Sequence, residues 1–115
     1  MTRILVDADG VLVDFVGGYL HAVHVVTGRR YTCNDVTDWD FTALGLTTTE
    51  RRGVEEFIFR PGWVRDLAEI PGAALGIEAL RNAGAEVVFV TSPWRGHFTW
   101  AAERETWLGL RWPGF

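Results

Sequence analysis

Two carboxylates separated by one small residue follow the first apolar run of the chain. Residues 4–6 are branched and apolar, and Asp7-Ala8-Asp9-Gly10 comes directly after them. A short run of this kind predicts a buried parallel strand, and residues two apart on a strand project to the same side. We therefore expect Asp7 and Asp9 to converge on one ligand at the carboxyl end of the strand, where open α/β sheets place their chemistry.

Two like charges this close repel each other unless a cation or a shared proton offsets them. A hard divalent cation that prefers oxygen ligands, such as Mg²⁺, is the simplest solution, so Asp7 and Asp9 are candidate metal ligands. Gly10 permits a tight turn after the strand. The alternative is purely structural, because Asp and Gly are ordinary turn residues.

A second apolar run ends in hydroxyl side chains. Residues 87–90 predict another buried strand, and Thr91-Ser92-Pro93 follows it. The pattern over residues 71–83 predicts a helix that connects the two strands. A connection of this kind between parallel strands is right-handed by the usual rule.

Neighbouring parallel strands end at the same edge of a sheet, so we expect Thr91 and Ser92 to lie beside Asp7 and Asp9. Hydroxyls and loop amides at that edge suit phosphoryl oxygens, and a carboxylate can attack phosphorus. A turn or a helix cap is the structural alternative for the hydroxyl pair.

The elements that must position these groups follow ordinary patterns. Helical spacing runs over residues 15–27 and ends at Gly28, and a final helical pattern occupies residues 96–110. Residues 29–70 are irregular, except that Thr47-Thr48-Thr49-Glu50 is a capping-box signature that begins a helix. We therefore expect one α/β domain over residues 1–115, with a core of about 1–28 and 71–115 and an insertion of about 29–70.

Composition narrows the function. The 115 residues are 48% hydrophobic and 23% charged, as in a globular protein, and the net charge of −4 disfavours a nucleic-acid polymer as partner while small anionic substrates remain compatible. All eleven basic residues are Arg, so no step that requires Lys can be run by this chain alone. One cysteine, Cys33, excludes an internal disulfide, and no apolar run reaches membrane-spanning length or resembles a signal peptide; we expect a cytoplasmic location.

Other side chains allow more than one interpretation. His21 and His24 lie three apart on the first helix, but a metal pair lacks a third ligand of matching spacing, so surface or core histidines are favoured. Arg95 follows the hydroxyl pair and is either a phosphate ligand or a solvated surface residue. The aromatic residues of the insertion form either a satellite core or a lid suited to a planar base; they are Trp39, Phe41 and Trp63.

The segment Asp7-Ala8-Asp9-Gly10-Val11-Leu12-Val13-Asp14-Phe15 resembles the first motif of the haloacid dehalogenase (HAD) superfamily, and Val88-Phe89-Val90-Thr91-Ser92-Pro93 resembles the second. Within the superfamily, Arg60-Pro61-Gly62-Trp63, Pro71-Gly72-Ala73 and Trp107-Leu108-Gly109 make the chain similar to the 5'(3')-deoxyribonucleotidases. The resemblance implies a shortened Rossmann-like core in which the insertion forms a small helical cap.

The resemblance also implies a function, that of a phosphatase: a Mg²⁺-dependent phosphohydrolase acting on phosphomonoesters, above all deoxynucleoside monophosphates. Asp7 would be the nucleophile that forms an aspartyl-phosphate, and Asp9 would act first as acid and then as base. Mg²⁺ would bridge the Asp7 carboxylate, the Asp9 carbonyl and the phosphate. Thr91 and Ser92 would bind phosphoryl oxygens, and the base pocket would be lined by Phe15 and Trp63, with Trp39 or Phe41.

The chain departs from the superfamily pattern downstream. The third motif carries a Lys or an Arg and the fourth carries Asp residues, whereas this sequence has no Lys and no Asp after Asp66. The alternative is therefore a catalytically impaired nucleotide-binding or regulatory module. A transferase that holds a sugar nucleotide through Asp-x-Asp leaves the Thr-Ser-Pro element unexplained. Only two strands are evident, and their open apolar edge leads us to expect self-association as a homo-oligomer.

Overall fold

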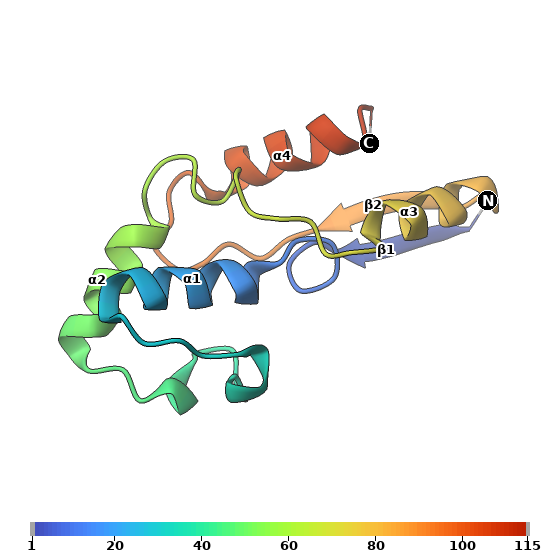
Figure 1. Cartoon of the computed structure of the whole chain (residues 1–115). Coiled ribbons are helices and arrows are strands. Elements are labelled where there is room, and N and C mark those ends of the chain that lie inside the picture. Colours follow the sequence, from blue (N-terminus) through green and yellow to red (C-terminus); the bar gives the residue numbers. More distant parts are fainter. Residues whose placement is uncertain (1, 115) are drawn as a thin grey trace.

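The computed structural model describes residues 2–114, in which strands and helices follow each other as an α/β fold (Figure 1). The prediction of the α/β class is thereby confirmed. In chain order the elements are β1 (Arg3–Asp7), α1 (Phe15–Thr27), the short 3₁₀ turns η1 (Cys33–Asp35) and η2 (Thr42–Leu44), α2 (Thr48–Ile58), α3 (Ala73–Asn82), β2 (Glu86–Val90) and α4 (Trp100–Arg111).

The two strands pair in parallel, and α3 is part of the connection between them. The register sets Asp7 opposite Val90, and the backbone N–H of Ala8 donates to the carbonyl of Val90 at 2.8 Å. Both strands therefore end at one edge of the sheet. The chain continues from that edge into the acidic loop on one side and into Thr91 on the other.

The expectation that both strands are buried is wrong. Leu5 is 67% exposed and Val90 43% exposed, and the register places these two residues on the same face of the sheet. The opposite face is partly covered, since the Phe89 ring packs against Trp112 at the end of α4 with centroids 5.3 Å apart. Within residues 2–114, helices thus cover mainly one face of the sheet. An apolar run in the sequence predicts a strand but does not show whether one or both of its faces are covered.

Local capping explains where the helices begin and end. Asp14 accepts a hydrogen bond from the Gly17 N–H at 2.9 Å to begin α1, and Gly28 ends that helix in the left-handed conformation. The predicted capping box of Thr47 and Glu50 is present at the start of α2. By contrast, α3 begins at Ala73 and α4 at Trp100, both later than their patterns suggest.

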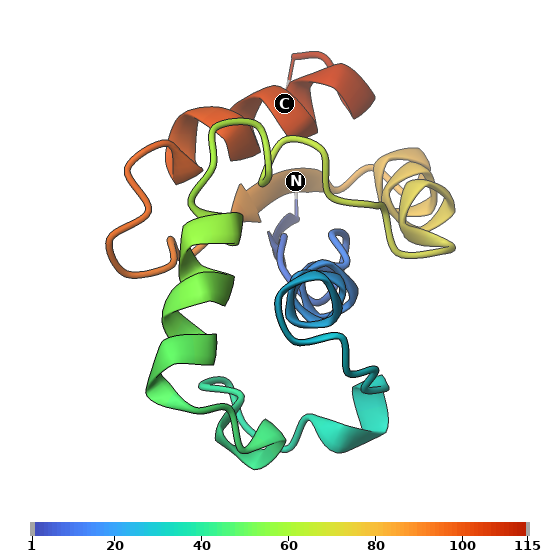
Figure 2. The same cartoon turned by 60° about the vertical axis from the view of Figure 1, so that its left-hand side comes forward.

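The aromatic part of the core gathers around the ring of Phe15 at the start of α1. Five other rings have centroids 5.5 to 6.2 Å from that of Phe15, and we call the set the Phe15 cluster. Figure 2 looks nearly along α1 and shows α2 and α4 arranged around it. The other members of the cluster come from α1, the segment 29–70, the loop after β2 and α4; they are Tyr19, Phe41, Trp63, Trp94 and Trp100.

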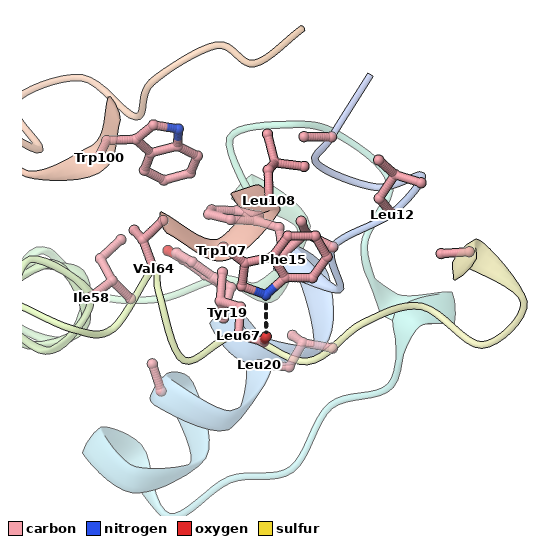
Figure 3. Packing of buried hydrophobic residues seen from close by; sticks show 14 of the residues in the cluster. Leu12, Phe15, Tyr19, Leu20, Ile58, Val64, Leu67, Trp100, Trp107 and Leu108 are labelled. Carbon is pink, nitrogen blue, oxygen red and sulfur yellow. Dashed lines mark hydrogen bonds between the residues drawn. The ribbon is translucent and has the colours of Figure 1, made fainter. Parts of the chain in front are cut away.

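Trp107 connects α4 to the segment that precedes α3. Its side chain is fully buried, and its indole N–H donates to the carbonyl oxygen of Leu67 at 2.7 Å (Figure 3). Helix α4 is therefore attached to the core by packing and by a buried hydrogen bond.

We predict that Trp107→Ala lowers the free energy of unfolding by about 3–5 kcal/mol, because it leaves a cavity and an unpaired buried carbonyl. Urea titration followed by circular dichroism measures this loss. The matched control is Trp39→Ala, since Trp39 is 76% exposed and its removal should change stability by no more than about 0.5 kcal/mol. Equal losses in the two variants would contradict the described burial.

Candidate active site

The loop after β1 folds back on itself and so holds the two acids at the edge of the sheet. The backbone N–H groups of Leu12 and Val13 both donate to the carbonyl of Ala8 at 2.9 Å. Gly10 has a φ of +83°, which a residue with a side chain rarely adopts, and its N–H donates to the Val13 carbonyl at 3.0 Å. The predicted role of Gly10 in a tight turn is confirmed.

A cavity of about 800 Å³ opens at this edge, and it brings together side chains from distant parts of the sequence. Acids, aromatic rings and cations all contribute to its wall. The lining consists of Asp7, Asp9, Phe15, Trp39, Asp40, Arg51, Glu55, Phe59, Ser92, Pro93, Trp94, Arg95 and Trp100. The carboxylates, a hydroxyl and aromatic surface therefore share one space large enough for a nucleotide-sized ligand.

Of the two acids that follow β1, Asp7 is the one that remains available to a ligand. It is exposed at the end of β1, and within residues 2–114 its carboxylate forms no hydrogen bond or ion pair. Ser92 is likewise exposed on the cavity wall. Both groups can approach a bound molecule without first breaking a contact.

Asp9 differs, because both of its carboxylate oxygens are engaged. Oδ1 accepts from the Nη2 of Arg104 at 2.6 Å, and Oδ2 accepts from the hydroxyl of Thr91 at 2.9 Å. The side chain is only 16% exposed. Burial raises the pKa of the Asp9 carboxyl above its ordinary value, although the Arg104 charge and the Thr91 hydrogen bond act in the opposite direction.

Arg104 is the residue of the site that sequence reasoning missed. Its side chain is 1% exposed, and its guanidinium lies 5.3 Å from the ring centroid of Trp100 and 5.8 Å from that of Trp107. Burial lowers the pKa of Arg104, and the charge of Asp9 opposes that effect. The sequence held a signal for the burial of Arg104. The residue comes four after Trp100 and three before Trp107, so it shares their apolar helix face.

The structure separates the predicted pair of hydroxyls. The Thr91 hydroxyl donates to Asp9 and accepts from the indole N–H of Trp100 at 3.1 Å, so it faces the acid, whereas Ser92 faces the cavity. Both members of the pair nevertheless lie beside the two acids.

The predicted aromatic residues also divide into two groups. Phe15 and Trp39 line the cavity, whereas the lining does not include Phe41 or Trp63. Phe41 is 1% exposed and stacks on Tyr19 with centroids 3.8 Å apart, and Trp63 meets the Phe15 ring edge-on. These two residues therefore lie behind the cavity wall, within the Phe15 cluster.

The donor set fits a hard cation, held loosely. Among residues 2–114, no three His, Cys, Asp or Glu side chains are grouped as a metal site. His21 and His24 therefore have no third ligand of this kind beside them. The family resemblance assigns a cation to the Asp7 carboxylate and the Asp9 carbonyl, and the Asp9 side chain is engaged by Arg104 and Thr91. Oxygen donors suit Mg²⁺, which keeps several waters when few protein ligands are offered.

Two parallel strands whose carboxyl ends bring Asp7, Asp9 and Ser92 to one cavity agree with the resemblance to the haloacid dehalogenase superfamily, and the family match supports the same class. Residues 1–115 match the model of a family described as 5' nucleotidase, deoxy (pyrimidine), cytosolic type C protein, and the chain belongs to this family.

Two curated relatives are bacterial proteins provisionally named 5'(3')-deoxyribonucleotidase. The chain is 31% identical over 109 residues to the one from Bordetella bronchiseptica and 30% identical over 110 residues to the one from Bordetella pertussis. Each match covers 91% of this chain and 57% of the relative, so the chain spans little more than half the length of these relatives. No helix within residues 2–114 is long and apolar enough to cross a membrane.

Glu103 fastens the beginning of α4 beside the cavity. One carboxylate oxygen accepts the backbone N–H of Arg65 at 3.1 Å, and the other accepts the hydroxyl of Thr99. Partial burial raises the pKa of Glu103, but the hydrogen bonds from Thr99, Arg65 and Gly62 outweigh it, so the net pKa lies below the ordinary value of 4.5. The ionised form therefore stabilises the fold.

We predict that Glu103→Gln destabilises the protein near neutral pH by about 1–2 kcal/mol, because it weakens hydrogen bonds to a charged acceptor. A carboxyl group with a lowered pKa loses its stabilising effect as the pH falls through and below its unfolded value of 4.5. The difference from wild type should thus shrink on acidification, as measured by urea unfolding between about pH 7 and about pH 3. Glu105→Gln, on the exposed side of α4, is the control, and a difference independent of pH would contradict the prediction.

Proposed function

We propose that the site hydrolyses phosphate monoesters, above all deoxynucleoside monophosphates, through an aspartyl-phosphate. The observation that carries this proposal is that two neighbouring acids line one cavity but differ in their hydrogen bonds and ion pairs. Asp7 is free to act as a nucleophile, whereas Asp9 is held in place by Arg104 and Thr91. Membership of a 5'-nucleotidase family and the names of the Bordetella relatives support the same reaction.

The proposed reaction has two displacements at phosphorus. A carboxylate oxygen of Asp7 forms a bond to phosphorus while the bond to the nucleoside oxygen breaks, and Asp9 gives its proton to that departing oxygen. Water then attacks the aspartyl-phosphate, Asp9 takes up the water proton, and inorganic phosphate leaves with Asp7 restored. The raised pKa of Asp9 supports this double role, because a proton must be held and then released near the working pH.

The phosphate and the base would occupy different walls of the cavity. Ser92 and Arg95, which both line it, supply a hydroxyl donor and a positive charge for phosphoryl oxygens. Mg²⁺, held by the Asp7 carboxylate and the Asp9 carbonyl, would neutralise negative charge on the phosphate. Phe15 and Trp39 offer aromatic surface to a planar base, with Trp63 and Phe41 supporting Phe15 from behind. In this arrangement the segment 29–70 serves as a small cap over a core formed by about 1–28 and 71–115.

The alternative is a module that binds nucleotides without turning them over. It is motivated by the acids of the described site, since no three His, Cys, Asp or Glu side chains among residues 2–114 are grouped as a metal site. Calorimetric binding of a deoxynucleoside monophosphate without phosphate release and without a metal requirement would favour this alternative.

We predict that the chain releases phosphate from deoxynucleoside monophosphates in the presence of Mg²⁺, and that a chelator reduces the rate to background. Asp7→Asn should lower the rate by more than about 10³-fold, because it removes the nucleophile. Asp66→Asn is the matched control, since Asp66 is exposed and, within residues 2–114, its carboxylate pairs only with the neighbouring Arg65. Equal phosphate release by wild type and Asp7→Asn in every condition would refute the proposed reaction.

We also propose that the chain self-associates through the uncovered face of the sheet, where Leu5 and Val90 are exposed. Sedimentation velocity should detect a dimer or larger species, and Leu5→Glu should shift the population toward monomer. A wild-type monomer at high concentration would contradict this.

The proposed location is the cytoplasm, because a reducing compartment suits the exposed free thiol of Cys33.

A further inference from the structure

Helix α4 reaches both oxygens of Asp9 from two positions that lie one turn apart. Arg104 contacts Oδ1 directly. Trp100 reaches Oδ2 through an intermediate, because its indole N–H donates to the Thr91 hydroxyl and that hydroxyl donates to Asp9. The acid is therefore held from one helix by two separate routes.

The groups that make these contacts have little freedom to move. Trp100 and Arg104 are 2% and 1% exposed, and the Arg104 guanidinium is packed near the rings of Trp100 and Trp107. Each contact is directional, so a carboxylate held on both oxygens cannot rotate without losing one of them. The Nε of Arg104 is buried and has no hydrogen-bond partner among residues 2–114, a cost that a merely stabilising arginine would not be expected to carry.

We propose that α4 is the positioning element of the acid–base residue, with Arg104 and the Trp100–Thr91 pair as positioning residues for Asp9. This inference rests on the proposed function, because it takes Asp9 as the acid and base of phosphate-ester hydrolysis. It also gives Thr91 a role at Asp9 and leaves Ser92 as the hydroxyl that meets the phosphate. The helix thereby supplies a positive charge to a site in a chain that has no lysine.

Misplacing Asp9 should affect substrates according to their leaving groups. A nucleoside oxygen leaves as a strongly basic alkoxide and needs a proton from Asp9, whereas p-nitrophenolate leaves readily without one. The second displacement needs Asp9 as base whatever the substrate. A positioning defect should therefore slow the cleavage of nucleotides, leave the initial burst of p-nitrophenolate intact, and slow the turnover that follows the burst.

The experiment compares Trp100→Phe and Arg104→Gln with wild type. For both variants we expect kcat on a deoxynucleoside monophosphate to fall about 10–100-fold with KM changed less than about twofold, because one of two constraints on the acid is lost. The burst rate with p-nitrophenyl phosphate should stay within about twofold of wild type. Arg104→Lys should recover part of the loss, since it keeps a positive donor.

Trp107→Phe is the matched control. It makes the same change on the same helix and keeps an aromatic ring near Arg104, but the indole hydrogen bond that it removes goes to the carbonyl of Leu67 and not toward Asp9. It should lower stability without slowing the nucleotide reaction more than the p-nitrophenolate burst. The inference would be overturned if Trp100→Phe slowed both reactions equally, or if Trp107→Phe slowed the nucleotide reaction selectively.

A measurement without turnover distinguishes this inference from the proposed function. In ¹H–¹⁵N spectra, the indole signal of Trp100 should shift in Thr91→Val and in Asp9→Asn, while that of Trp107 stays in place and reports an intact fold. If the Trp100 signal shifts in both variants but the wild-type chain releases no phosphate, the proposed function is refuted and the positioning network is supported. A Trp100 signal that ignores both substitutions would overturn the network, whatever the activity.

Discussion

The ion pair between Asp9 and Arg104 is the constraint on which the rest of the site depends. Its partners lie 95 residues apart in the sequence, one in the loop after β1 and the other on α4. Removing one partner of a buried pair costs about 3–5 kcal/mol, mostly because the other charge is left without compensation. An apolar pair of similar size would serve stability at least as well, so the pair is better explained by the geometry that it imposes on Asp9.

The same aromatic residues build the core and the cavity. Phe15 contacts the rings of Trp94 and Trp100 and also lines the cavity beside the acids. Support for the site therefore comes from packing beyond the end of the two-stranded sheet and not from the sheet alone. The wall of the cavity is therefore closely packed where rings contact one another, whereas Trp39 projects toward solvent.

Much of the local structure and of the site could be predicted from residue types and spacing. The two strands, the cap and the end of α1, and the capping box of α2 all follow from neighbours in the sequence. Because parallel strands end at the same edge, Asp7, Asp9 and Ser92 were expected together, and they share one cavity. The failures concern burial, since apolar strands resemble each other whether one face or both are covered, and Leu5 is exposed.

What the sequence by itself determined is the class of chemistry: carboxylates two residues apart after one strand and hydroxyls after the next, with a family resemblance that the family match confirms. These features are local, because hydrogen-bonding patterns and the pleat of a strand act over a few residues. Only the tertiary structure decided which acid is free and which is held. That distinction depends on where Arg104 and Trp100 lie when α4 packs against the loop after β1. Helical spacing can indicate that Arg104 faces the core, but it cannot indicate a partner that lies 95 residues away.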